Sequence, residues 1–289
     1  MTPLDLVGLA PLMSRTTGRP EMLIGLIDGP VAVDHPELAG PRIREIRGNG
    51  SGSCTQTNSL ACLHGTFVAG ILSAKRGSSA PAICPNCTLL IRPVFTEAGA
   101  GSTQMPGATP QELAAAIIEC VEAGARCINL SLALDQPSSK GERELEQALD
   151  HAAKRGVIIV VAAGNQGTLG STAITRHSWV IPVIACDLRG RPTRESNLGG
   201  SIGSRGLASP GGTITSLAAA GGTLTLKGGT SVATPFVTGA IALLWSAFPS
   251  ATAMQVKFAV TQAYAPRRRT VVPLLMNAWA AYQFMMTTQ

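Results

Sequence analysis

Four polar residues in the sequence have the types and surroundings that nucleophilic catalysis requires. Asp28 ends an apolar run and precedes a Gly-Pro turn, whereas His64 begins the segment HGTFVAG, which predicts the start of a helix. Asn165 follows an apolar segment in the motif AAGN, and Ser231 lies in GGTSVATP, where a glycine-rich loop enters a long apolar helix. A carboxylate, an imidazole, an amide and a hydroxyl can together orient a base, take a proton, stabilise an oxyanion and attack a carbonyl carbon.

Three of these residues also have an ordinary structural explanation. Asp28 and Asn165 could simply form turns, and Ser231 could cap the helix that it enters. The functional interpretation of Ser231 is that the helix N-terminus favours negative charge and leaves a backbone N–H to donate to an oxyanion. His64 differs from the other three histidines, which lie in polar or helix-surface segments. The specific observation is the presence of all four residues in this order.

The segments around these residues predict a parallel sheet covered by helices. Apolar strands are expected at residues 22–27, 88–94, 127–132, 157–162 and 179–185, with helices at about 65–74, 110–123 and 142–155. This alternation is typical of a doubly wound α/β fold, in which functional residues lie at the carboxyl ends of strands. Residues 189–229 are rich in Gly, Ser and Thr and predict short strands and loops, and three helices follow from about residue 230.

The ordered motifs resemble those of the subtilisin-like serine proteases, over residues 22–248. The resemblance implies an α/β fold with a doubly wound parallel sheet flanked by helices, and the chain order Asp, His, Ser distinguishes it from chymotrypsin-like and α/β-hydrolase enzymes. It implies that Ser231 is the nucleophile, that His64 is the general base and that Asp28 orients His64. Asn165 and the backbone N–H of Ser231 would form the oxyanion hole.

The resemblance also implies where a peptide substrate binds. Residues 129–133, with the sequence NLSLA, are similar to the family's substrate-binding strand, so an extended peptide would pair with the backbone of Ser131, Leu132 and Ala133. Ala133 stands where the family usually has Gly, which alters that subsite. A roomy primary specificity pocket would be lined by three small residues, Ala162, Ala163 and Gly164.

One part of the chain indicates a particular branch of the family. Residues 177–191, with the segments 196–199 and 206–211, are similar to the proteases of cyanobactin pathways, which cut a leader from a ribosomal precursor peptide. Related macrocyclases transfer the acyl group to the substrate's own amine and carry an added helical insertion near the active site. Asp28 and His64 are only 36 positions apart (64 − 28), which leaves no room for a large insertion there, so we expect hydrolysis. The alternatives are a general intracellular subtilase and a macrocyclising relative.

The seven cysteines leave several possibilities open. Three lie in apolar segments and are expected to be buried thiols: Cys120, Cys127 and Cys186. The other four are Cys54 and Cys62, eight positions apart, and Cys84 and Cys87 in a C-x-x-C motif. They could form two disulfides, in these or crossed pairs, remain free thiols, or bind zinc, although the wide first spacing weakens the zinc interpretation.

The composition favours one large aliphatic domain. Apolar residues make up 45% of the 289 residues, and charged residues only 14%, which disfavours disorder and coiled coils. We therefore expect a single peptidase domain over residues 1–289, with an N-terminal extension at 1–21 and a C-terminal helical tail at 264–289. The extension is too short to form the folding pro-domain of many secreted subtilases.

Charge and patterning also bear on partners and location. The net charge of +6 comes mostly from scattered arginines, and aromatic residues are only 4%, so we expect a peptide partner, attracted electrostatically if acidic, and no nucleic acid. We find neither an apolar run of about 18 residues nor a secretory signal pattern, and so expect no membrane partner and a cytoplasmic location. No cofactor or metal site is predicted; the resemblance allows structural calcium without indicating its ligands, and nothing indicates the oligomeric state.

Two other classes of function compete with a protease. A catalytically silent binding module would usually have lost a reacting group, whereas Asp28, His64, Asn165 and Ser231 are all present. A redox or zinc protein centred on the C-x-x-C motif would leave the ordered set of four unexplained.

Overall fold

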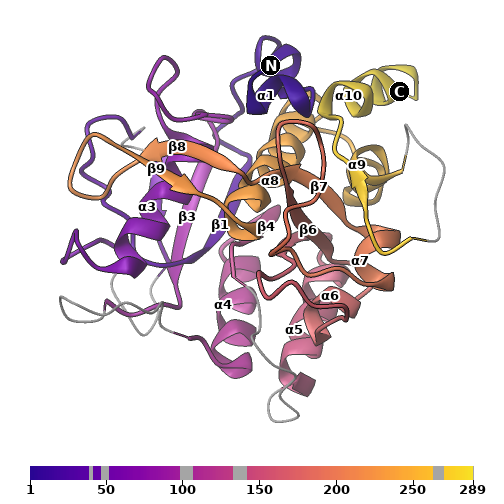
Figure 1. Cartoon of the computed structure of the whole chain (residues 1–289), viewed down its shortest axis with the longest axis horizontal. Helices are drawn as coiled ribbons and strands as arrows, with labels where there is room; N and C mark the ends of the chain where they lie inside the picture. The colour runs from indigo at the N-terminus through magenta and orange to yellow at the C-terminus, as the bar shows by residue number, and fades with distance from the viewer. Residues whose placement is uncertain (39–41, 47–51, 98–106, 133–141, 263–269, 289) are drawn as a thin grey trace.

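A parallel sheet forms the centre of the molecule (Figure 1). The computed structural model describes residues 1–38, 42–46, 52–97, 107–132, 142–262 and 270–288. In this part of the chain eight strands are joined by parallel pairings. Their spatial order is β10 (Leu274–Leu275), β7 (Leu207–Pro210), β6 (Ile181–Cys186), β5 (Ile158–Ala162), β4 (Cys127–Leu130), β1 (Leu23–Asp28), β3 (Thr88–Pro93) and β2 (Ile43–Glu45). The expected doubly wound α/β fold is confirmed.

Helices cover both faces of this sheet, which is why the central strands are apolar along their whole length. One face packs against α3 (Leu60–Ser73) and α8 (Thr230–Ala247), and the other packs against α4 (Pro110–Glu122) and α5 (Glu142–Lys154). All five residues of β5 are buried, as expected for a strand covered on both sides. Helix α8 is long and apolar enough to cross a membrane, but 89% of it is buried inside the domain.

Helix α3 begins earlier than the sequence pattern suggested. The hydroxyl of Ser59 accepts a hydrogen bond from the backbone N–H of Cys62 at 3.2 Å and caps a helix that starts at Leu60. His64 therefore lies in the second turn of α3 and not at its start. The consequence is that its position depends on the packing of the whole helix.

The chain between β6 and α8 forms the short elements expected for a Gly-, Ser- and Thr-rich region. They are α7 (Gly200–Arg205), β7 and the antiparallel hairpin of β8 (Thr213–Leu217) and β9 (Thr223–Lys227). The hairpin lies on α3, where the Ser216 hydroxyl donates to the Phe67 carbonyl at 2.7 Å. Its second strand leads directly into α8 and therefore to Ser231.

Both ends of the chain pack onto the same body. The N-terminal helices are α1 (Pro3–Leu6) and α2 (Leu9–Met13), and Leu9 and Leu12 of α2 are completely buried. The Arg76 guanidinium donates to the Met13 carbonyl at 3.1 Å. At the other end β10 extends the sheet, and α10 (Ala278–Thr287) packs against α2 and α9 (Ala253–Thr261). The remaining short helix, α6 (Ala173–Arg176), precedes β6.

Candidate active site

The predicted residues gather where three neighbouring strands end. In the register of the sheet Ile27 of β1 lies beside Leu130 of β4, and Leu130 lies beside Val161 of β5. The next residues along these strands are Asp28, Ser131 and Ala162. Because parallel strands end at a common edge, residues far apart in the sequence meet here.

Asp28 and His64 form a hydrogen-bonded pair. Asp28 Oδ1 lies 2.7 Å from His64 Nδ1 and also accepts the Gly29 backbone N–H at 2.7 Å. The Asp28 side chain is fully buried, whereas that of His64 is 16% exposed. With Nδ1–H donating to the carboxylate, the lone pair of His64 lies on Nε2, which is the nitrogen that can accept a proton.

Two opposing effects act on the pKa of His64. Burial disfavours the imidazolium, but the charge of Asp28 and its hydrogen bond stabilise the imidazolium more strongly, so the pKa is raised above its ordinary value. The site therefore favours the protonated imidazole that forms when a nucleophile gives up its proton.

Glycines allow α3 to come close enough for this contact. A Cβ atom at Gly65 would lie 2.5 Å from the carbonyl oxygens of both Gly29 and Pro30, and one at Gly29 would lie 2.0 Å from the Ala61 carbonyl oxygen. Backbone packs directly on backbone where the chain leaves Asp28. The glycine that follows His64 is thus part of the geometry of the pair.

Ser231 lies at the second position of α8, beside the same strand ends. Its carbonyl accepts a hydrogen bond from the Ser131 hydroxyl at 2.9 Å, and α8 packs on α3 as well as on β4 and β5. Gly229 is the N-cap and gives no side-chain cap, so the alternative of Ser231 as a capping residue is wrong. Among the described residues neither Ser231 Oγ nor His64 Nε2 has a hydrogen-bond partner.

Asn165 is held by Thr230, the residue before Ser231. Its Oδ1 accepts hydrogen bonds from the backbone N–H of Thr230 at 2.9 Å and from the Thr230 hydroxyl at 3.0 Å. The side-chain oxygen is thereby committed, and within the described chain the exposed Nδ2 amide has no partner. An N–H donor next to the N-terminus of α8 is what an oxyanion hole needs. Sequence reasoning did not identify Thr230.

The predicted substrate-binding residues that the structure describes lie at the ends of β4 and β5. Ser131 and Leu132 are buried at the end of β4, and Ala133 lies outside the described residues. Of the three small residues expected to line the specificity pocket, Ala162 ends β5 and Ala163 and Gly164 follow it. Gly164 has a φ of +107°, a conformation that favours glycine. The Ser131 side chain points to α8, where its hydroxyl donates to the Ser231 carbonyl; the sequence resemblance did not suggest this contact.

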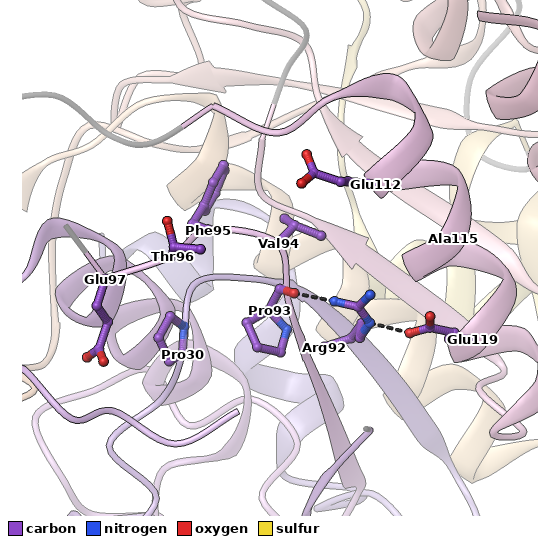
Figure 2. A pocket seen from close by; sticks show the side chains of 10 residues that line it. All are labelled: Pro30, Arg92, Pro93, Val94, Phe95, Thr96, Glu97, Glu112, Ala115 and Glu119. Atoms are coloured by element: carbon purple, nitrogen blue, oxygen red, sulfur yellow. Dashed lines mark hydrogen bonds and ion pairs between the residues drawn. The ribbon is translucent and has the colours of Figure 1, made fainter. Parts of the chain in front are cut away.

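A hollow that the sequence did not predict lies beside the strand end of Asp28 (Figure 2). It encloses about 210 Å³, and the Arg92 guanidinium in it donates to Glu119 and to the Pro93 carbonyl. Figure 2 shows Glu112 on the same helix as Glu119, α4, and Glu97 on the other side of the hollow. Burial raises the pKa of the Glu97 carboxyl, but hydrogen bonds from Thr55 and Gln56 lower it by more. The pKa therefore lies below its ordinary value, and Glu97 is ionised. The lining therefore carries charges of both signs.

The cysteines resolve into one disulfide and five thiols. Cys54 and Cys62 form a disulfide, with their Cα atoms 5.6 Å apart. Cys62 lies two positions before His64 in the chain. Glu97 lies close enough to the two sulfurs to suggest a metal site, but the disulfide uses both sulfurs and Thr55 and Gln56 occupy the carboxylate. We assign no metal to this group.

The other predicted cysteine pair is not formed. Cys84 and Cys87 are separate buried thiols, so the Cys84–Cys87 disulfide and the crossed pairings are wrong. The backbone N–H of Cys87 donates to the Cys84 carbonyl at 3.0 Å in a tight turn. A separate hydrogen bond between the two thiols, together with burial, raises the pKa of the Cys84 thiol. The three cysteines of the apolar segments are buried thiols as expected.

Sequence comparisons agree with this geometry. A family model described as the subtilase family matches residues 19–274. Subtilisin DY of Bacillus licheniformis is 30% identical over 239 residues, which cover 81% of this chain and 80% of that protein. A thermophilic serine proteinase of Bacillus sp. (strain AK1) is 32% identical over 80% of this chain, which spans 54% of that longer protein.

Solved structures give similar results. A serine-to-alanine variant of the protease domain of PatA has a TM-score of 0.85 at 28% identity, covering 94% of this chain and 98% of that one. The prenylagaramide maturation protease PagA has a TM-score of 0.81 at 29% identity, and the match covers 96% of this chain and 98% of that one. The PatG macrocyclase domain shares the fold, with a TM-score of 0.82 at 22% identity, covering 97% and 96%. On its site geometry and these similarities, the chain belongs to the subtilase family of serine proteases.

Proposed function

We propose that this subtilase is a serine endopeptidase that removes the leader from a ribosomally made precursor peptide. The observation that carries the chemistry is the 2.7 Å contact of buried Asp28 with His64 beside the α8 N-terminus, where Ser231 and Asn165 lie. Two features support the substrate class: the similarity to a protease whose title names prenylagaramide maturation, and the similarity of residues 177–191 to cyanobactin-pathway proteases.

The reaction follows from the positions of these groups. Ser231 Oγ attacks the scissile carbonyl carbon while its proton passes to His64 Nε2, and the negative oxygen binds the Asn165 amide and the Ser231 backbone N–H. The C–N bond then breaks as His64 returns the proton to the leaving amine. Water next gives a proton to His64 and attacks the acyl-enzyme, which releases the new carboxyl terminus and restores the Ser231 hydroxyl. Ser231, His64 and water carry every proton that moves, so the proposal requires no cofactor.

Hydrolysis is favoured over transfer of the acyl group to an amine. Between Asp28 and the start of α3, the described residues contain the short strand β2 and no helix. An insertion that would cover the acyl-enzyme and exclude water is therefore absent from the described part of that interval. The likeness to the PatG domain, at 22% identity, concerns the fold.

Cleavage of matched peptides tests the proposal. A peptide that spans a leader–core junction, an unrelated denatured protein and a Ser231→Ala variant should be compared by mass spectrometry in oxygen-labelled water. We expect faster cutting at the junction, one labelled oxygen in the new carboxyl terminus, and no product from Ser231→Ala. Equal cutting of the denatured protein would contradict the substrate class, and an amide-linked product without label would support transfer instead.

A further inference from the structure

The second turn of α8 lacks a hydrogen bond that a helix normally makes. The carbonyl of residue i accepts the N–H of residue i+4, and four positions after Ser231 stands Pro235, which has no N–H. The Ser231 carbonyl accepts the Ser131 hydroxyl instead, at 2.9 Å. We propose that Ser131 is a positioning residue for the nucleophile, which supplies from β4 the donor that Pro235 withholds. The inference rests on the proposed peptidase function.

A directed chain of hydrogen bonds orients this hydroxyl. Further along α8, the Thr238 hydroxyl donates to Asn129 Oδ1 at 2.8 Å, and Asn129 Nδ2 donates to Ser131 Oγ at 2.7 Å. Because Ser131 Oγ already accepts from Asn129, its own proton is directed at the Ser231 carbonyl. The residues Asn129, Ser131 and Thr238 are at most 3% exposed, so water does not compete for these bonds.

The arrangement holds Ser231 from both sides. On the N-terminal side Asn165 Oδ1 accepts the Thr230 N–H, and on the C-terminal side Ser131 binds the Ser231 carbonyl. These anchors come from the ends of β5 and β4, which are neighbours in the sheet. The peptide unit that joins Gly229 to Thr230 and the one that follows Ser231 are thus fixed to the strands that also carry the substrate-binding segment, and a shift of α8 would move Oγ relative to His64.

The proposal predicts a coupling between two substitutions. Ser131→Ala keeps the backbone that would pair with substrate but removes the donor, so kcat on a chromogenic peptide should fall about 10- to 100-fold while KM stays within about twofold, since small misplacements of a nucleophile are costly. Pro235→Ala restores an N–H at position 235. In that background, Ser131→Ala should therefore cost less than about threefold, which a double-mutant cycle measures.

A matched control separates positioning from packing. Ser209 of β7 is a fully buried serine in the same sheet, and its hydroxyl has no hydrogen-bond partner among the residues that the structure describes, so Ser209→Ala should leave kcat within about twofold. Thermal unfolding checks that each variant is folded. If Ser131→Ala does not fold, Thr238→Val removes the first donor of the chain with little change of shape and should lower kcat about threefold.

The outcomes distinguish this inference from the proposed function. Two results would overturn the positioning role while the wild type is active. One is an unchanged kcat in folded Ser131→Ala. The other is that Ser131→Ala lowers kcat by the same factor in the wild type and in the Pro235→Ala variant. For Thr238→Val, an unchanged kcat in the folded variant would do the same. A wild type that turns over no peptide and whose Ser231 reacts with no serine-directed reagent would instead overturn the peptidase proposal.

Discussion

Replacing Gly65 with alanine should separate the catalytic pair without unfolding the protein. The new Cβ would lie 2.5 Å from two carbonyl oxygens, those of Gly29 and Pro30, whereas ordinary contact begins at 3.4 Å. Helix α3 or the turn after Asp28 must therefore move by about 0.9 Å (3.4 − 2.5). Both atoms that close the gap belong to backbone, so no side-chain rotation relieves the overlap.

The size of the effect follows from this displacement. Because either movement stretches the 2.7 Å contact of Asp28 with His64, and misplacement by about 1 Å can cost roughly 10²-fold in rate, we expect kcat/KM to fall about 100-fold. Alanine is favoured over glycine in a helix interior by about 1 kcal/mol, which offsets part of the strain, so the variant should remain folded.

The assay compares kcat/KM and thermal unfolding for Gly65→Ala and for a control, Gly200→Ala. Gly200 is also in a helix, α7, but a Cβ there meets no atom within 4 Å, so its substitution should leave activity within about twofold. A folded Gly65→Ala with the wild-type kcat/KM would show that the close approach of α3 does not position His64.

Three further predictions concern the base, the oxyanion hole and the disulfide. Catalysis needs neutral His64, and Asp28 raises the pKa of His64, so kcat/KM should fall as the pH falls through a midpoint above about 6.5. Asp28→Asn should lower this midpoint and reduce kcat about 10³- to 10⁴-fold. A midpoint that does not move in Asp28→Asn would contradict the pairing of Asp28 with His64. Asn165→Ala should reduce kcat about 10²- to 10³-fold at nearly constant KM, as the equivalent loss does in subtilisin; an unchanged kcat would remove the amide from the oxyanion hole. Reducing the disulfide of Cys54 and Cys62, which are eight positions apart, should lower the free energy of unfolding by roughly 2.5 kcal/mol; urea unfolding with and without a thiol reductant measures this, and a Cys54→Ser/Cys62→Ser variant that still responds to reductant would contradict the assignment.

The positions of the catalytic residues were predictable because they follow from local patterns. A continuous apolar run such as that of β5 reads as a buried parallel strand, and functional residues lie at the carboxyl ends of such strands. Asp28 and Asn165 could therefore be placed by the strands they follow. The resemblance to a known family then assigned their roles.

Features that depend on distant contacts could not be read in the same way. Ser131 contacts the Ser231 carbonyl from 100 positions away, so the sequence indicated a substrate-binding strand and gave no sign of the side-chain contact. The proline four positions after the nucleophile was the available signal, since it leaves one helix carbonyl without a donor. The hollow beside Asp28 likewise depends on Arg92 meeting Glu119 across the β3–α4 packing.

The cysteines illustrate a case in which spacing could not rank the alternatives. A C-x-x-C motif is common in disulfides and metal sites, yet Cys84 and Cys87 form a buried turn as free thiols. The wider pair, Cys54 and Cys62, is bonded because the loop after β2 returns to the first turn of α3. The approach of Cys54 to Cys62 depends on the tertiary structure, so the spacing of the cysteines does not predict it.

Intact-mass measurement after treatment with a fluorophosphonate, which reacts with activated serine, shows whether Ser231 is the nucleophile. We expect one adduct on the wild-type protein, mapped by peptide sequencing to Ser231, and none on Ser231→Ala. Labelling should be strongly slowed in His64→Ala, because the base that activates the hydroxyl is then absent. A wild type without adduct, or an adduct that persists in Ser231→Ala, would contradict the assignment of Ser231 as the nucleophile.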